Sequence, residues 1–315
     1  MMRSIYRHRS AVRLLPLAAL LAASLLIFTS CRFPGSTPAV SEPEEITEPE
    51  KVPDPTETAA QTEPPETVPA ETAPSADRTA EEIYLMHGEL TPVNYDSPAL
   101  LPRTEDAGQS YVDNITFLCD SPFYWLKLYG LLSGGYDTTQ IWTGPEGTMT
   151  LGFLRGFRIL DPVDNELRTI SETAALRRPP MMLIAVGING VALWDEEEFK
   201  AEYVWLIDEI RQASPDTEIL LQSILPIAPT YAHWGMITNA SITAANAWIL
   251  EVAEECGLHY LDTFSVLVGE DGNIRPELVR DDGLHANDEG LKLALEYIRT
   301  HAYITAEESG DGSGS

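Results

Sequence analysis

An alternation of short apolar runs with amphipathic helical patterns constrains this chain more than any other feature, and it extends from residue 115 to near the C-terminus. Each helix in such an alternation returns the chain to the same edge of a sheet, so successive strands run parallel. The pattern therefore predicts an α/β fold with helices packed on a mainly parallel, five-stranded sheet. The expected strands cover residues 115–119, 139–142, 181–186, 218–223 and 258–261, and the expected helices begin near residues 122, 170, 195, 243 and 287.

The clearest of these helices is expected from Asp195 to Ala213. Apolar side chains recur there every three or four positions, and the acidic residues at its start lie where the helix dipole is positive. The apolar positions are Phe199, Tyr203, Leu206, Ile207 and Ile210. The segment 84–114 has no comparable period, and we expect it to be mostly irregular and packed on the domain.

The first 31 residues have the pattern of an export signal, in which several arginines precede the apolar run 14–28. This run is shorter than the roughly 20 apolar residues that a transmembrane helix needs. It ends in Phe-Thr-Ser-Cys31, which resembles the lipobox of bacterial lipoproteins with Phe in place of the usual Leu. We therefore expect residues 1–31 to be a lipoprotein signal and Cys31 to be lipidated, on the outer face of the cytoplasmic membrane. An ordinary secretory signal with an incidental cysteine is the alternative.

The segment 32–82 is rich in Pro, Glu, Thr and Ala and has almost no aromatic residues. Such a composition cannot bury enough apolar surface to offset the entropy of ordering, so we expect a disordered spacer. Its prolines and like charges favour an extended chain that holds the folded domain, expected at 83–305, away from a surface. A flexible tail is expected at 306–315. The formal net charge of −29 makes nucleic acid a poor partner.

The first candidate for chemistry follows the strand 115–119, where Asp120 and Ser121 lead into a helix that starts near Pro122. Ligands bind beyond the carboxyl ends of the strands in open α/β sheets. A helix N-terminus also lowers the cost of a negatively charged serine oxygen, which suits a nucleophile. A serine in this place is a common helix N-cap as well, so the motif alone leaves both interpretations open.

Two further candidates lie in later loops. The strand 181–186 leads into Gly-Ile-Asn189-Gly, where the Asn189 amide either donates to an oxyanion or only serves a turn. Before the last helix, Asp282 precedes His285 by three residues, so its carboxylate can accept the Nδ1 proton and leave Nε2 facing a nucleophile. A metal site is the alternative for this pair, but the sequence offers no companion His or Cys pair at ligand spacing.

Together the three pieces occur in the order and spacing of the SGNH/GDSL hydrolases, and residues 112–303 resemble that family. The family has a Gly-Asp-Ser nucleophile block, an oxyanion-hole Gly and Asn, and a late Asp-x-x-His. The resemblance implies that Ser121 is the nucleophile, that Asn189 donates to the oxyanion, and that Asp282 and His285 complete a catalytic triad. It also implies a flavodoxin-like three-layer α/β/α fold and ester hydrolysis without a cofactor or a metal.

The oxyanion glycine is either Gly144 or Gly147, because both follow the second expected strand. In the family this glycine lies several residues beyond the strand, which favours Gly147, with the backbone N–H of Ser121 as a further donor. Two positions depart from the family pattern, since Cys119 replaces the first Gly of Gly-Asp-Ser and Gly190 replaces the Asp after the Asn. We expect Cys119 to be tolerated only if the backbone there does not need a positive φ.

Aromatic residues occur beside the same loops and are candidates for stacking on sugar rings, although a core or lid position is the commoner role for any one of them. They are Tyr124, Trp142, Trp194, Tyr231 and Trp234.

These observations predict a membrane-tethered, cell-surface serine esterase that removes a short acyl group, such as acetyl, from a small-molecule or glycan ester. Two other classes stay open. A catalytically silent glycan-binding module of the same fold is favoured by the altered family blocks, and a solute-binding lipoprotein fits the anchor and the acidic spacer. A solute-binding lipoprotein gives no reason for the Asp-x-x-His pair. Fold alone does not decide among the esterase, the binding module and the solute-binding protein.

Overall fold

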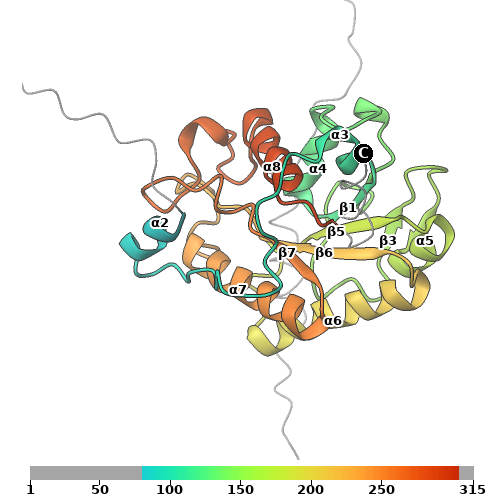
Figure 1. Ribbon diagram of the computed structural model, residues 1–315, viewed down its shortest axis with the longest axis horizontal. Helices are drawn as coiled ribbons and strands as arrows, with labels where there is room; N and C mark the ends of the chain where they lie inside the picture. The colour runs from blue at the N-terminus through green and yellow to red at the C-terminus, as the bar shows by residue number, and fades with distance from the viewer. Residues whose placement is uncertain (1–79, 305–315) are drawn as a thin grey trace, which may run out of the picture. The chain divides into compact units, whose positions relative to one another are not determined.

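The computed structural model of the protein describes residues 80–304 (Figure 1). The expected export signal 1–31 with Cys31, the spacer up to residue 79 and the tail from residue 305 lie outside the described residues and stay predictions. Within 80–304, no helix is both long enough and apolar enough to cross a membrane.

Five parallel strands form the central sheet, in the order β2-β1-β5-β6-β7. They are β1 (Ile115–Cys119), β2 (Ile141–Trp142), β5 (Met181–Ala185), β6 (Glu218–Gln222) and β7 (His259–Leu261). Because β1 pairs with both β2 and β5, the loops that follow these three strands meet at one edge of the sheet. The predicted five-stranded parallel sheet is therefore confirmed.

Helices cover both faces of this sheet (Figure 1). One core joins α5, α6 and α7 to one face through strand residues such as Ile184 and Leu221. A second core joins α3, α4 and α8 to the other face through Phe117 and Leu183. The helices are α2 (Ala80–Met86), α3 (Gly108–Asp113), α4 (Ser121–Leu128), α5 (Ile170–Arg177), α6 (Glu196–Ala213), α7 (Asn239–Cys256) and α8 (Asp288–Thr300), with short 3-10 helices at Gly135–Asp137 and Pro276–Leu278. The three-layer arrangement matches the prediction.

The segment before β1 is mostly irregular, as expected, but it begins earlier than the expected domain start at residue 83. Helix α2 starts at Ala80, and its Ile83 and Tyr84 are buried in the core. Farther along, the N–H of Leu101 donates to the carbonyl oxygen of Tyr260 at 3.0 Å, which attaches the segment alongside β7.

Helix α7 begins at Asn239, four residues before the expected start near residue 243. The reason is a capping box, in which the Thr238 side chain accepts the N–H of Ser241 and the Ser241 side chain accepts the N–H of Thr238. Thr243 instead lies inside the helix, where its hydroxyl donates to the carbonyl oxygen of Ala240.

An antiparallel hairpin that the sequence analysis did not predict lies between β2 and α5. Its strands are β3 (Arg158–Leu160) and β4 (Leu167–Thr169). Each has three residues, mostly exposed or half-buried, so neither shows the apolar period that predicts a strand. The N–H of Leu160 donates to the carbonyl oxygen of Thr143 at 3.2 Å. The hairpin is thereby attached at the end of β2, beside the loop that contains Gly147.

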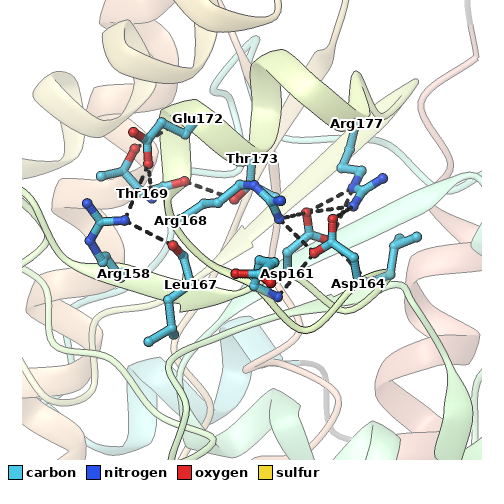
Figure 2. A network of polar contacts seen from close by, with 11 residues as sticks. Arg158, Asp161, Asp164, Leu167, Arg168, Thr169, Glu172, Thr173 and Arg177 are labelled. Carbon is cyan, nitrogen blue, oxygen red and sulfur yellow. Dashed lines mark hydrogen bonds and ion pairs between the residues drawn. The ribbon is translucent and has the colours of Figure 1, made fainter.

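A network of charged side chains ties this hairpin to α5 (Figure 2). Asp161 is completely buried and accepts from Arg168 Nη1 at 2.8 Å and from Arg177 Nε at 2.9 Å. Asp164 accepts from the same two guanidinium groups, at 2.7 Å and 2.6 Å. A buried carboxylate needs such partners, because an unpaired charge in the interior is costly.

Candidate active site

Ser121 is the first residue of α4 and directly follows the turn at the end of β1. Asp120 is the N-cap residue in an extended conformation, and Pro122 occupies the first turn, where its missing N–H costs no helical hydrogen bond. The backbone N–H of Ser121 likewise has no acceptor within the helix. Ser121 is only 8 % exposed, and its Oγ lies 3.0 Å from Nε2 of His285.

His285 follows a turn that Asp282 organises. Oδ1 of Asp282 accepts the backbone N–H groups of Leu284 and His285, both at 2.9 Å, and Oδ2 lies 3.0 Å from His285 Nδ1. Partial burial opposes ionisation of this carboxyl, but the hydrogen bonds from His285 and Leu284 outweigh burial and hold the pKa of Asp282 well below its usual range. With Nδ1 donating to Asp282, Nε2 is free to accept the Ser121 proton. The structure thus joins Ser121, His285 and Asp282 in one hydrogen-bonded chain.

Asn189 lies beside the loop that contains the two candidate oxyanion glycines. Its Nδ2 donates to Thr148 Oγ1 at 3.1 Å and to the carbonyl oxygen of Met149 at 2.9 Å. The N–H of Gly147 donates to the carbonyl oxygen of Gly144 at 2.9 Å, so these glycines form one turn. The Gly147 N–H and the Asn189 amide therefore already have acceptors in the loop, and they must share or exchange these bonds to reach a substrate.

Asp120 has a structural connection that the sequence analysis missed. Its carboxyl is buried, and Oδ2 accepts the backbone N–H of Gly187 at 2.9 Å, two residues before Asn189. Burial raises the pKa of Asp120 to about 7, whereas the N–H groups of Gly187 and Ile188 act in the opposite direction. Asp120 therefore ties the start of α4 to the Asn189 loop. Its signals in the sequence are its place between the strand and Ser121 and its match to the Asp of the family's Gly-Asp-Ser block.

A small pocket lies against these same residues, at the carboxyl ends of β1, β5 and β6. Asp120 and Ser223 are its polar lining residues, and the others are Pro122, Phe123, Ala185, Val186, Ile188, Ile224 and Leu225. The pocket thus contacts the two residues that flank Ser121 in the sequence.

Both departures from the family pattern are compatible with the local structure. Cys119 is completely buried in β1 and is not among the residues with a positive φ, so no glycine is needed there. Burial raises the pKa of its thiol, which disfavours the reactive thiolate. At Gly190 an added Cβ would lie 3.2 Å from Cβ of Leu151, so the family's Asp would crowd the neighbouring loop.

The expectation that Trp142 contacts a substrate is wrong for this structure. Trp142 is 2 % exposed and belongs to the apolar core, because both residues of the short strand β2 are buried. Its ring is covered by core side chains and presents no face to a ligand.

Of the other four aromatic residues, Tyr124 belongs to α4, and Trp194, Tyr231 and Trp234 lie in loops. Tyr124 is half-buried and packs on Gly147, and Trp194 donates from Nε1 to the carbonyl oxygen of Leu151 at 3.0 Å. Trp234 is half-buried against the core.

Tyr231 is 8 % exposed and belongs to a loop that packs on the turn before His285. The N–H of Ala228 donates to the carbonyl oxygen of Gly283 at 2.8 Å, and an added Cβ at Gly283 would lie 2.5 Å from the Tyr231 nitrogen. The loop after β6 therefore supports the His285 turn by direct backbone packing.

Among residues 80–304, no group of three or more His, Cys, Asp or Glu side chains is arranged to hold a metal ion.

Comparison with known proteins identifies one family. The pattern of the GDSL-like Lipase/Acylhydrolase family matches residues 125–293, more than half of the 315-residue chain. The match includes Asn189, Asp282 and His285 and begins shortly after Ser121. A search of curated protein sequences finds no significant match.

Solved structures similar to this chain include three bacterial and fungal proteins. A candidate platelet activating factor from Streptococcus pneumonia is 19 % identical over 71 % of this chain and 93 % of its own, with a TM-score of 0.44. A GDSL-like lipase from Bacteroides thetaiotaomicron is 18 % identical over 61 % and 95 %, with a TM-score of 0.39. A carbohydrate esterase family 3 protein from Talaromyces cellulolyticus is 17 % identical over 59 % and 93 %, with a TM-score of 0.36.

The family pattern spans the strands β5 to β7, the Asn189 loop and the Asp282–His285 turn. Together with the parallel sheet and the hydrogen-bonded chain that begins at Ser121, it gives one conclusion: this protein belongs to the GDSL-like lipase/acylhydrolase family.

Proposed function

We propose that this protein is a serine esterase that hydrolyses a short acyl ester, such as an acetyl ester, with Ser121 as the nucleophile. The observation that carries the proposal is the chain of two hydrogen bonds, each 3.0 Å long, from Ser121 Oγ to His285 Nε2 and from His285 Nδ1 to Asp282 Oδ2. A nucleophile, a base and a group that orients the base within hydrogen-bond reach are the minimum for this chemistry.

In the proposed reaction, His285 Nε2 takes the Ser121 proton while Oγ attacks the ester carbonyl carbon. The imidazolium then protonates the leaving alcohol as the carbon–oxygen bond of the ester breaks, which leaves an acyl group on Ser121. A water molecule attacks that acyl group, His285 takes the water proton, and the proton returns to Ser121 as the acid departs. The Asp282 carboxylate stabilises the imidazolium in both halves of the cycle.

The developing oxyanion needs donors, and the proposal assigns this role to the Ser121 N–H, the Gly147 N–H and the Asn189 amide. The first is free of helical partners, whereas the other two now donate within their own turn or to Thr148 and Met149. Binding of an ester must therefore draw these two donors toward the carbonyl oxygen. The present bonds of these two donors are also the observation that favours a second candidate function, a catalytically silent glycan-binding module. In such a module the two donors would keep their present acceptors.

The half-buried aromatic rings of Tyr124, Trp194 and Trp234 support a carbohydrate as the alcohol part of the ester. The lipobox at Cys31 supports a place on the outer face of the cytoplasmic membrane.

Covalent labelling with a fluorophosphonate tests the central claim. We expect wild type to be labelled on Ser121 and to hydrolyse an aryl acetate, and the Ser121→Ala variant to do neither. Equal hydrolysis by both proteins would remove the esterase proposal. An unlabelled wild type that binds a glycan saturably without hydrolysing its acyl groups would make the silent module the better description.

A further inference from the structure

Arg280 lies two residues before Asp282, and three groups hold its guanidinium. Its Cζ lies 3.7 Å from the ring centroid of Trp125, and its Nη1 donates to Tyr129 Oη at 2.8 Å. Its Nε lies 3.4 Å from Oδ2 of Asp282. Contacts with a ring face, a hydroxyl and a carboxylate fix both the plane and the position of a guanidinium, which a flexible surface arginine does not achieve.

The oxygen that Arg280 faces is the one that also contacts His285. Oδ2 of Asp282 lies 3.0 Å from His285 Nδ1, while Oδ1 is occupied by two backbone N–H groups. The N–H of Arg280 also donates to the carbonyl oxygen of His285 at 2.9 Å, which closes the turn. The Asp282 carboxylate is therefore held on both oxygens, and Arg280 adds a permanently cationic contact.

The partners of Arg280 come from the same helix as Ser121. Trp125 and Tyr129 follow Ser121 at intervals of four residues, so all three lie along one face of the helix that starts at Ser121. The Trp125 ring also lies 5.8 Å from the His285 imidazole, centroid to centroid. Arg280 thus joins the nucleophile's helix to the turn that carries the base.

We propose that Arg280 is a positioning residue that registers the Asp282–His285 turn against the Ser121 helix through Trp125 and Tyr129. The inference rests on the proposed esterase function. In this role the guanidinium keeps the Asp282 carboxylate directed at His285 Nδ1, and its charge disfavours a second positive charge on the imidazole nearby.

The charges around His285 set the sign of the expected pH effect. Asp282 and Arg280 face it from its own turn, and Tyr129, the C-cap residue of α4, lies beyond Arg280. The loop packed on Gly283 brings Tyr231, which contacts His233 edge to face. Because Arg280 places a positive charge near the imidazole, removal of that charge should move the acid limb of activity to higher pH.

Arg280→Gln, Arg280→Lys and Tyr129→Phe test the role against wild type. We expect Arg280→Gln to lower kcat roughly 10-fold to 100-fold, with KM little changed, because the base is misplaced while the substrate contacts remain. The acid limb of its kcat/KM profile should move to higher pH. Arg280→Lys should restore the acid limb but not kcat, since an ammonium keeps the charge without the planar fork. Tyr129→Phe should cause a smaller loss of kcat.

Arg155→Gln is the matched control. Arg155 also lies over a tryptophan ring, with its Cζ 4.6 Å from the Trp205 centroid, and it donates to the Glu202 carboxylate. Within residues 80–304, the Arg155 guanidinium contacts Trp205 and Glu202 rather than the Asp282 turn, so its loss should leave the acid limb unchanged.

Two results for Arg280→Gln would overturn the proposal. A raised KM with unchanged kcat and an unmoved acid limb would make Arg280 a substrate-binding group. Kinetics identical to those of wild type would show that Arg280 has no role in the reaction. An NMR titration of the His285 ring, assigned with His285→Asn, separates this from a failure of the esterase proposal. If wild type hydrolyses no ester but the His285 titration still moves to higher pH in Arg280→Gln, the positioning role stands and the function fails. If the protein is an esterase and the titration does not move, the positioning role fails.

Discussion

Tyr124 lies directly over Gly147, so closely that a β-carbon at position 147 would come within 2.4 Å of the tyrosine ring. Gly147 also has a φ of +73°, a left-handed conformation that other residues adopt at a cost. The glycine therefore meets two separate demands, close approach and positive φ, in the loop that carries the proposed oxyanion donor.

Gly147→Ala should both destabilise the protein and lower its activity, since the methyl group must displace Tyr124 or the loop. Gly156→Ala is the matched control, because Gly156 has a φ of +74° in the same loop region but nothing within 4 Å of an added Cβ. The control should lose about 1 kcal/mol of stability from backbone strain alone and retain activity. Thermal melts and aryl acetate hydrolysis separate the two effects, and equal losses in both variants would contradict the steric argument.

Ser121, His285 and Asp282 should behave as one catalytic unit. Ser121→Ala and His285→Ala are each expected to reduce kcat by several orders of magnitude, and the double variant by little more, because either loss already abolishes nucleophilic attack. Asp282→Asn should be milder. Single-turnover rates of the three variants and the double variant provide the measurement, with melting temperatures as the fold control. Additive losses on the logarithmic scale would argue against a single unit.

Asn189→Ala should lower kcat by about 100-fold if the amide stabilises the oxyanion. The structure adds a stability cost, since the amide also bonds to Thr148 and Met149. Thr148→Val separates the two roles, because it removes one acceptor of the amide while the amide itself remains. A kcat loss in Thr148→Val as large as that in Asn189→Ala would indicate that Asn189 acts only by holding the loop.

Asp161→Asn should destabilise the protein by about 2 to 3 kcal/mol, because Arg168 and Arg177 lose the buried half of their carboxylate partners. Asp106→Asn removes a comparable contact with Arg299 at an exposed site and should have almost no effect. Denaturant unfolding of both variants tests the contrast. Similar stabilities would show that Asp164 alone sustains the network.

Asp262 is buried beside the end of β7, and burial raises the pKa of its carboxyl to about 7, with the neighbouring Ser265 acting the other way. A carboxyl whose pKa is higher in the folded than in the unfolded chain binds its proton more tightly when folded. Its contribution to stability is therefore present below about pH 4 and is lost as pH rises toward 7.

Asp262→Asn removes this titration, so the melting temperature of the variant relative to wild type should rise steadily between pH 4.5 and 8. The melting temperature of the variant itself should still depend on pH, because Asp120 also titrates near pH 7 and is present in both proteins. The exposed Asp216→Asn is the control and should follow wild type at every pH. A constant difference between Asp262→Asn and wild type would contradict the prediction.

Much of the fold was predictable because its signals are local. The apolar runs at β1 and β5 gave strands whose observed bounds differ from the expected ones by at most one residue, and the acidic start of α6 marked its cap at Asp195. The predicted start of α7 near residue 243 was wrong, because Thr238 and Thr243 are both residues of a type that commonly caps a helix N-terminus. Only the reciprocal bond with Ser241 distinguishes them.

Roles that depend on distant partners were not predictable for residues that belong to no family motif. The hairpin of β3 and β4 is held by Asp161 and two arginines rather than by an apolar stripe. The sequence does not distinguish a buried tryptophan from one that stacks on a ligand, and only the packing of β2 shows that Trp142 is buried.

For this chain, the sequence by itself determined the order of strands and helices and the polar residues that follow the strand ends, because periodicity and capping act over a few residues. The tertiary structure decided that Ser121 Oγ and His285 Nε2, 164 positions apart, lie 3.0 Å from each other, and that Arg280 rests on Trp125. Such distances follow from how the whole core packs. A stretch of sequence holds no information about which distant side chain will fill the space beside it.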